Sequence, residues 1–333
     1  MTHYDVAVVG AGLGGLTAAA ILARAGRKVL VIEGGNSVGG AASSYKVGDL
    51  FVEGSLHETS NPRHPGDPKY DVLDRAGVRD AVEWVPVEEF YEVRGGPLSQ
   101  PFTLPDDFAG ACSALAARFP DHRAAIRQLL DEMHGAASAV DNAPAGNGRP
   151  SLAQRLDTLF GDDEPVKCAL AANLCYYHDD PASLPWDAFA RAQGRYFLNG
   201  ACFIRGGSQR LSSALARAIR AAGGTMLLRR VATRFAFAAD DNPVGVTHAA
   251  RGGGDPQTVA CDHIVINAAP TAATPMLPDS IAVRWSETYA SRQPSISLFT
   301  LTLGLAESPC RYGFIRYSTQ LLPDWMTRLT DYA

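Results

Sequence analysis

Hydrophobic runs at the start of the chain follow the order strand, helix, strand. Residues 4–9 form a short β-branched apolar run, which is typical of a buried parallel strand. Residues 16–25 are strong helix formers, and Gly26 is placed to end that helix. Residues 28–33 form a second apolar run, which ends in an acid, Glu33. This order predicts a βαβ unit at the N-terminus.

The middle of the chain changes from short strands to a run of helices. A hairpin, a short helix and an extended segment come first, over 44–53, 69–76 and 82–87. Helices are then expected over 106–139, with Asp106 or Asp107 as N-cap, and over 151–160, 164–174 and 184–196, with a Gly/Pro-rich break at 142–150.

The last third returns to alternating helix and strand patterns. A helix is expected from residue 209 to 222, and strands over 225–228, 231–237, 244–247, 263–267 and 295–303. The alternation of strands and helices at both ends, around a helical middle, predicts an α/β protein with an inserted helical region.

The composition indicates a globular protein with a small-molecule partner. The 333 residues suffice for about two domains, and 46% are hydrophobic. The 30 Lys and Arg and 35 Asp and Glu are scattered and give a net charge of -5, so no nucleic-acid surface is expected. The six cysteines contain no C-x-x-C pair, which argues against a zinc site, and no metal site is expected.

The turn after the first strand satisfies the pattern G-x-G-x-x-G. Gly10 would allow the tight turn, Gly12 the close approach of a diphosphate, and Gly15 the packing of helix on strand. The free N–H groups of the helix N-terminus favour a diphosphate without any lysine. Glu33 at the end of the next strand would accept the ribose hydroxyls, which disfavours NADP and leaves NAD and FAD.

A second glycine pair follows the acid. Gly39-Gly40 resembles the di-glycine motif of the FAD-binding amine oxidase and carotenoid desaturase superfamily. Many members have an arginine after the pair, whereas Ala41 stands here, and this is closer to the branch resembling phytoene desaturases, carotenoid isomerases and retinol saturases. A flexible surface loop is the alternative interpretation of the pair.

Further segments resemble the same branch. Residues 51–58 resemble its segment toward the flavin, which would bring His57 to the flavin or substrate face, although a hydrogen-bonded loop histidine is an equal alternative. Residues 203–211 and 262–270 resemble its G-G-x-x-x-L helix and its strand beneath the cofactor. The resemblance implies FAD as cofactor and the following cofactor-binding residues: Gly10, Gly12, Leu13, Gly14, Gly15, Glu33, Gly34, Gly39, Gly40, Ala41 and, through its backbone, Val231.

The resemblance implies an α/β fold, a Rossmann-like FAD-binding domain of the glutathione-reductase-2 type with an inserted, largely helical substrate domain. Residues 1–95 and 203–280 would form the FAD-binding domain, 96–202 the insertion and 281–333 the return to the substrate domain. The family's C-terminal FAD segment has no counterpart, so the chain resembles about two-thirds of such an enzyme. A downstream fragment that completes the fold is therefore an expected partner.

The expected function is FAD-dependent desaturation, saturation or isomerisation of an apolar polyene, retinoid or other isoprenoid. Because the flavin supplies the hydride chemistry, no catalytic side chain is assigned. A lipid-binding protein of the same fold, resembling GDP-dissociation inhibitors, and an NAD-dependent dehydrogenase are the alternatives. The apolar run at residues 6–23 lacks the basic flank of a signal peptide, so a cytoplasmic location is expected, with peripheral contact to the inner membrane compatible with an apolar substrate.

Two features of the inserted region have competing interpretations. The sequence His178-Asp179-Asp180 suggests a metal, but a solvated loop is the preferred interpretation because adjacent side chains do not converge on one ion. The aromatic residues would line an apolar tunnel or form an ordinary core, and both interpretations stay open. These aromatics are Phe102, Phe108, Phe119, Phe160, Tyr176, Tyr177, Trp186, Phe189, Tyr196, Phe197 and Phe203.

Overall fold

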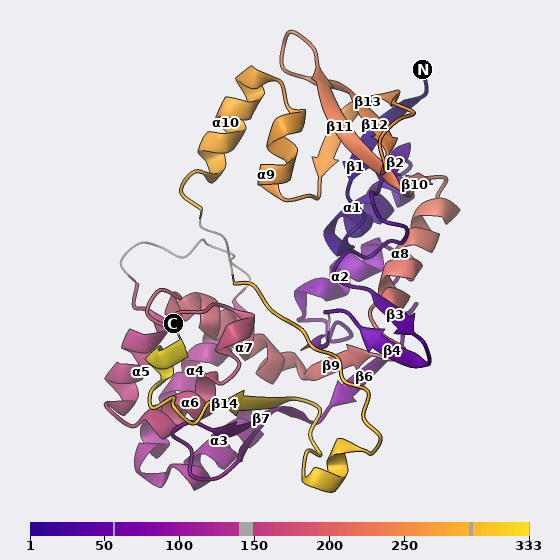
Figure 1. Ribbon diagram of the computed structural model, residues 1–333. Helices are drawn as coiled ribbons and strands as arrows, with labels where there is room; N and C mark the ends of the chain where they lie inside the picture. The colour runs from indigo at the N-terminus through magenta and orange to yellow at the C-terminus, as the bar shows by residue number, and fades with distance from the viewer. Residues whose placement is uncertain (56, 140–148, 293–295, 333) are drawn as a thin grey trace. The chain divides into compact units, whose positions relative to one another are not determined.

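The computed structural model describes residues 1–55, 57–139, 149–292 and 296–332 (Figure 1). The chain forms two compact units, each built from discontinuous segments. Unit 1 comprises Met1–His57, Pro68–Trp84 and Ile204–Pro294, and unit 2 comprises Glu58–Asp67, Val85–Phe203 and Ser295–Ala333. Residues 58–67 and 85–95 thus belong to unit 2, although the sequence suggested a first segment that runs unbroken from 1 to 95.

Unit 1 contains a six-stranded sheet in the order β10-β2-β1-β13-β12-β11 (Figure 1). The first four strands of this order run parallel, and β12 and β11 add an antiparallel ribbon. Every residue of β2 is buried, as expected for a strand covered on both faces. The strands are β1 (His3–Val9), β2 (Val29–Ile32), β10 (Thr225–Leu227), β11 (Arg230–Phe237), β12 (Pro243–Ala250) and β13 (Gln257–Ile266).

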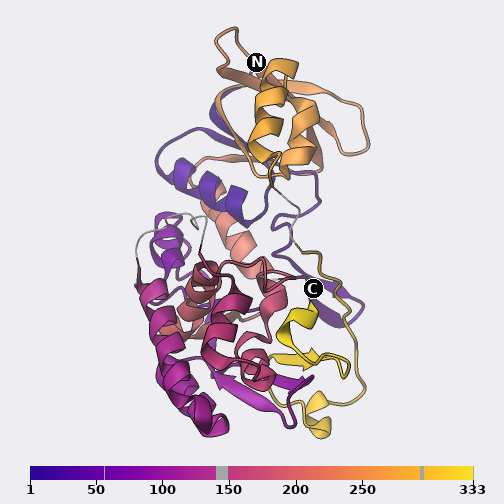
Figure 2. The ribbon, with the colours of Figure 1, turned by 90° about the vertical axis from the view of Figure 1, so that its left-hand side faces the viewer.

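Helices cover both faces of this sheet. Helices α1 (Leu13–Arg24) and α8 (Gln209–Ala221) pack side by side, and α1 turns small residues toward the strands. Helices α9 (Pro270–Ala273) and α10 (Asp279–Tyr289) lie against the sheet in Figure 2. Ala273 and Leu277 join Phe235 of β11 in one apolar cluster. The predicted βαβ start and the return strands of unit 1 are therefore confirmed.

Smaller elements of unit 1 also match the sequence pattern. The predicted hairpin is present as β3 (Ser44–Val47) and β4 (Leu50–Glu53), with Gly48 at φ 58° in its turn. Helix α2 (Pro68–Arg75) coincides closely with the predicted helix.

Unit 2 combines helices with two small sheets, orders β14-β7-β8 and β5-β9-β6. The predicted helices are present, and Asp107 is the N-cap of the first because its side chain accepts from Gly110 N at 2.8 Å. The break at 142–150 lies mostly outside the described residues. The helices are α3 (Phe108–Arg118), α4 (Arg123–Ser138), α5 (Leu152–Phe160), α6 (Glu164–Ala171) and α7 (Trp186–Asn199); the strands are β5 (Thr59–Ser60), β6 (Trp84–Val87), β7 (Glu89–Gly95), β8 (Phe102–Pro105), β9 (Ala201–Ile204) and β14 (Thr319–Leu322).

Unit 2 is less purely helical than the sequence suggested. The antiparallel pair β7 and β8 was not expected, and β14 pairs in parallel with β7 from far along the chain. Residues that follow β14, among them Met326 and Leu329, are buried in the same apolar core. The late segment of the chain is thus part of unit 2.

The strand predicted over 295–303 is wrong for the part that the structure describes. Residues 296–303 adopt no regular structure, and Phe299 is 93% exposed. The alternation of apolar and polar residues fits a strand, but in the described chain no neighbouring strand pairs with it.

The helices in the described ranges are too short or too polar to cross a bilayer.

Candidate functional site

The glycine-rich turn lies between β1 and α1 in unit 1. Gly10 has φ 98°, a backbone conformation that favours glycine, and a Cβ there would lie 2.4 Å from the carbonyl oxygen of Asn267. A Cβ at Gly15 would lie 2.1 Å from the carbonyl oxygen of Gly10. The roles predicted for Gly10 in the tight turn and Gly15 in helix packing are therefore confirmed.

The N-terminus of α1 has the geometry of an anion site. The helix begins at Leu13, and no side chain caps it at Gly12. The first intrahelical bond is donated by Leu16 N to Gly12 O, at 2.9 Å, so the N–H groups of Leu13 and Gly14 stay available to a ligand. The cradle therefore fits a diphosphate at the predicted residues Gly12, Leu13 and Gly14.

Glu33 follows β2 and is bound from both sides by backbone N–H groups. Its carboxylate oxygens accept from Ala11 N at 2.7 Å and from Gly35 N at 2.6 Å. Each carboxylate oxygen has a second lone pair, so the group can still accept hydroxyl donors. These contacts hold Glu33 beside the glycine turn, as its expected role at the ribose requires.

The second glycine pair packs directly on the first turn. Gly39 N donates to Ala11 O at 2.8 Å, and Gly39 forms an isolated parallel β-bridge with Gly12. Gly39 and Gly40 have φ 119° and 59°, and a Cβ at Gly40 would lie 3.3 Å from the Cα of Gly12. The pair is thus a second layer of the turn, and the interpretation as a flexible surface loop is wrong.

The remaining expected residues lie around this turn or at the edge of unit 1. Val231 stands near the start of β11, and its side chain is 3.4 Å from a Cβ built on Gly34, so Val231 lies against the residue that follows Glu33. Ala41 is exposed beside the glycine pair. His57 is exposed in the loop after β4, and its role toward a flavin stays a prediction.

One residue of this site was missed by the sequence analysis. Asn267, directly after β13, places its carboxamide against the glycine turn, with Oδ1 2.7 Å from a Cβ built on Gly14. The signal was present, because the strand 263–267 was predicted to return beneath the cofactor, but nothing in the pattern showed which residue ends at the turn.

Comparison with known families identifies the chain. The model of the flavin containing amine oxidoreductases matches residues 13–307, which is most of the chain. The chain belongs to this family. The match begins at Leu13, after Gly10 and Gly12, and includes α1, Glu33 after β2, the glycine pair Gly39 and Gly40, and the return strand β13.

Distant relatives of this amine oxidoreductase family member include a retinol reductase and a phytoene dehydrogenase. All-trans-retinol 13,14-reductase from Macaca fascicularis is 24% identical over 79% of the chain and 47% of its own length. Phytoene dehydrogenase from Streptomyces griseus is 27% identical over 83% of the chain and 55% of its own length. The chain thus spans about half the length of these relatives.

Solved structures show the same fold. An oxidoreductase from Methanosarcina mazei aligns with a TM-score of 0.66 over 87% of the chain and 65% of its own length, at 19% identity. The mixed α/β architecture of this flavoprotein family is therefore shown for the chain.

A second group of polar side chains lies in unit 2. Burial, together with like-charge repulsion from the carboxylates of Asp106 and Glu89, raises the pKa of Glu58 to about 8. Glu58 Oε1 is buried and has no hydrogen-bond partner in the described chain. Asp106 accepts from Ala201 N at 3.0 Å. The sequence pattern did not single out Glu58, because burial cannot be deduced from a loop sequence.

Most aromatic residues of unit 2 form an ordinary core. Phe90 stacks on Tyr196 with ring centroids 4.6 Å apart and meets Phe197 edge-on at 5.5 Å. Phe189 is fully buried, whereas Tyr176 is 57% exposed. The core interpretation therefore holds for most of these rings.

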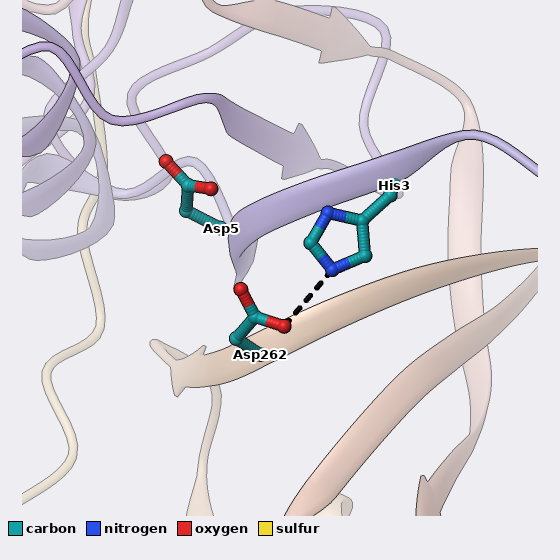
Figure 3. Close-up of side chains that lie close together, drawn as sticks. All are labelled: His3, Asp5 and Asp262. Atoms are coloured by element: carbon teal, nitrogen blue, oxygen red, sulfur yellow. Dashed lines mark hydrogen bonds and ion pairs between the residues drawn. The ribbon is translucent and has the colours of Figure 1, made fainter.

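Two groups with metal-ligating side chains have partners of their own. His3 Nε2 lies 2.9 Å from Asp262 Oδ1, and Asp5, within 4.8 Å of both, accepts from the backbone N of Lys28 (Figure 3). These contacts join β1 to β13 and to the residue before β2. The cluster is therefore interpreted as a pair of surface contacts between strands. In the loop at 178–180, the Nδ1 of His178 accepts from Asp180 N, which fits a solvated loop.

Proposed function

We propose that the chain is the FAD-binding part of an oxidoreductase that desaturates, saturates or isomerises an apolar polyene of the retinoid or carotenoid class. The observation that supports this most is the layered glycine site in unit 1, where Glu33 and the free N-terminus of α1 lie side by side. When bound, FAD would supply the hydride chemistry.

The residues of this site fit the parts of an adenine dinucleotide. Gly12, Leu13 and Gly14 would bind the diphosphate, Glu33 the ribose hydroxyls, and the start of β11 at Val231 the adenine. Gly39 and Gly40 would widen the cradle toward the flavin, because backbone without side chains allows close approach. An acid at Glu33 would repel a 2′-phosphate, which disfavours NADP.

The substrate class rests on similarity and is tested separately. The relatives named above act on retinol or phytoene by name, and the chain covers about half of each. Desaturation moves a hydride and a proton from the substrate and leaves reduced flavin. Anaerobic mixing of the FAD-loaded chain with phytoene would therefore bleach the flavin absorption near 450 nm, an approximate value for the free cofactor. No bleaching with phytoene, no reduction of retinol by the chemically reduced protein and no change in the isomer composition of either polyene would together reject the polyene assignment.

Cofactor binding is tested by thermal unfolding with FAD and with NAD in parallel. A ligand present at about 100 times its Kd stabilises the native state by about 2.7 kcal/mol, so FAD should raise the melting temperature by several degrees. NAD should raise it less. Stabilisation by NAD alone would favour a dehydrogenase, and stabilisation by neither would favour a non-catalytic protein of the same fold.

The variant Glu33→Gln tests the site itself. It removes the negative charge that accepts the ribose hydroxyls and should reduce the FAD-induced shift by at least half, by analogy with the loss of a charged hydrogen bond. Glu287→Gln, at an exposed position of α10, is the matched control and should leave the shift unchanged.

A further inference from the structure

Asn267 is fixed at the glycine turn by the sheet. It follows β13 directly, and its backbone N donates to Val9 O at 2.8 Å, which continues the parallel pairing with β1. Val9 is the residue before Gly10, where the glycine turn begins. The register therefore holds the side chain of Asn267 over the turn.

The glycines of the turn are arranged around this side chain. A Cβ on Gly12 would lie 3.1 Å from Nδ2 of Asn267, and a Cβ on Gly14 would lie 2.7 Å from its Oδ1. A Cβ on Gly15 would lie 3.1 Å from both the Cβ and the Nδ2 of Asn267, and one on Gly10 would meet its backbone carbonyl. Four glycines of the turn thus face one asparagine.

The carboxamide of Asn267 has unused hydrogen-bonding capacity. It offers two N–H donors and one acceptor oxygen, and none of them bonds to a protein group in the described chain. The residue is only partly buried, so a ligand can reach it. Its Nδ2 lies 3.1 Å from a Cβ built on Gly12, the residue before α1, and the free N–H groups at the start of this helix would bind an anion.

We propose that Asn267 is a dinucleotide-binding residue whose carboxamide donates a hydrogen bond to the diphosphate of the cofactor. This rests on the function proposed above, and it assigns a role to a residue outside the glycine pattern. A neutral donor suits the position, because it adds attraction for the diphosphate without filling the turn as a longer lysine or arginine would. An aspartate of the same shape would place a negative charge against the diphosphate.

The test compares Asn267→Ala and Asn267→Asp with the wild-type chain in calorimetric titrations with FAD. Loss of a hydrogen bond to a charged group should weaken binding about 10-fold in Asn267→Ala. Asn267→Asp should weaken it about 100-fold at about 0.05 M salt and clearly less at about 0.5 M, because salt screens charge repulsion. Asn242→Asp, an exposed substitution of equal charge in the turn between β11 and β12, is the control and should bind like wild type.

The possible outcomes separate this inference from the proposed function. Equal FAD binding by wild type and both Asn267 variants would overturn the inference alone. Lower melting temperatures of both variants without FAD, with equal losses of affinity at both salt concentrations, would make Asn267 a structural residue and also overturn it. A folded wild-type chain that does not bind FAD would overturn the proposed function and this inference with it.

Discussion

Two neighbouring glycines at the start of α1 differ in what an added methyl group would meet. At Gly15 it would lie 2.1 Å from a backbone oxygen, which cannot move aside, so Gly15→Ala should destabilise the chain by about 3 kcal/mol. At Gly14 it would meet only the side chain of Asn267. Gly14→Ala should therefore cost about 1 kcal/mol or less, since alanine also favours the helix. Chemical denaturation midpoints check both values, and equal losses would contradict the described packing.

A double substitution tests the contact between Gly14 and Asn267. If Oδ1 of Asn267 is what the added methyl group meets, Asn267→Ala should remove the strain of Gly14→Ala. The double variant should then be about 1 kcal/mol more stable than the sum of the single changes predicts. Strict additivity in the same denaturation measurement would show that the two residues do not touch.

Glu58 should make stability depend on pH. Its pKa is about 8 in the folded chain against 4.5 for a free side chain, because burial disfavours the charged form. The folded state then binds more protons between these values, so the contribution of Glu58 to stability falls as pH rises from about 4.5 to about 8. Glu58→Gln, which is neutral throughout, should gain in melting temperature relative to wild type over this range. A difference in melting temperature between variant and wild type that stays constant from pH 5 to 8 would contradict the raised pKa. Glu287→Gln is the control, and its difference from wild type should not change in this way.

At the scale of elements, the start of α5 offers the clearest test. Ser151 Oγ accepts from Gln154 N at 3.2 Å, and the Gln154 side chain accepts from Ser151 N at 2.9 Å, which forms a capping box. Ser151→Ala should destabilise the chain by about 1 kcal/mol. Ser113→Ala, exposed inside α3, should have no such cost because alanine is the better helix former. Equal melting temperatures of the two variants would contradict the role of the cap.

The elements that could be predicted from sequence are those with local signals. The turn of the β3–β4 hairpin has Gly48 at positive φ, and Ser151 and Asp107 cap their helices through side chains within four residues. The strand β14 was missed because it pairs with β7 across more than 200 residues, and no local pattern records that pairing.

The same distinction applies to the candidate site. Gly10, Gly15 and Glu33 could be found because a turn, a close approach and a strand end each demand a residue type at a fixed spacing. Asn267 and Glu58 could not, since their environments arise from segments distant in sequence. The pattern thus identified the glycine turn and the acid beside it, but not the side chains that distant segments bring to them.

At the scale of the whole molecule, exposed apolar side chains lie on the segment after residue 297. Phe299, Leu301, Leu303 and Leu305 alternate along one segment and are between 60% and 93% exposed. Exposed apolar residues in a strand-like pattern favour association with other chains. Coverage of these side chains by a downstream fragment stays a prediction, and a second copy of the chain is the alternative.

Polar substitutions on this segment should reduce self-association without loss of stability. Phe299→Ser with Leu301→Lys removes two exposed side chains that contribute little to the core, so the melting temperature should stay within about 2 °C. Light scattering after gel filtration should show a smaller mass at high concentration. Leu104→Ala, a buried control, should cost about 2–5 kcal/mol. An unchanged mass with a lower melting temperature would show that the segment is packed in solution.

The central claim is that unit 1 binds FAD at the layered glycine turn. The most direct measurement is the visible spectrum of the purified chain after incubation with FAD and removal of free flavin by gel filtration. If unit 1 binds FAD, the protein should be yellow, with one flavin per chain and absorption at about 450 nm. A folded chain that elutes colourless at saturating FAD would contradict it.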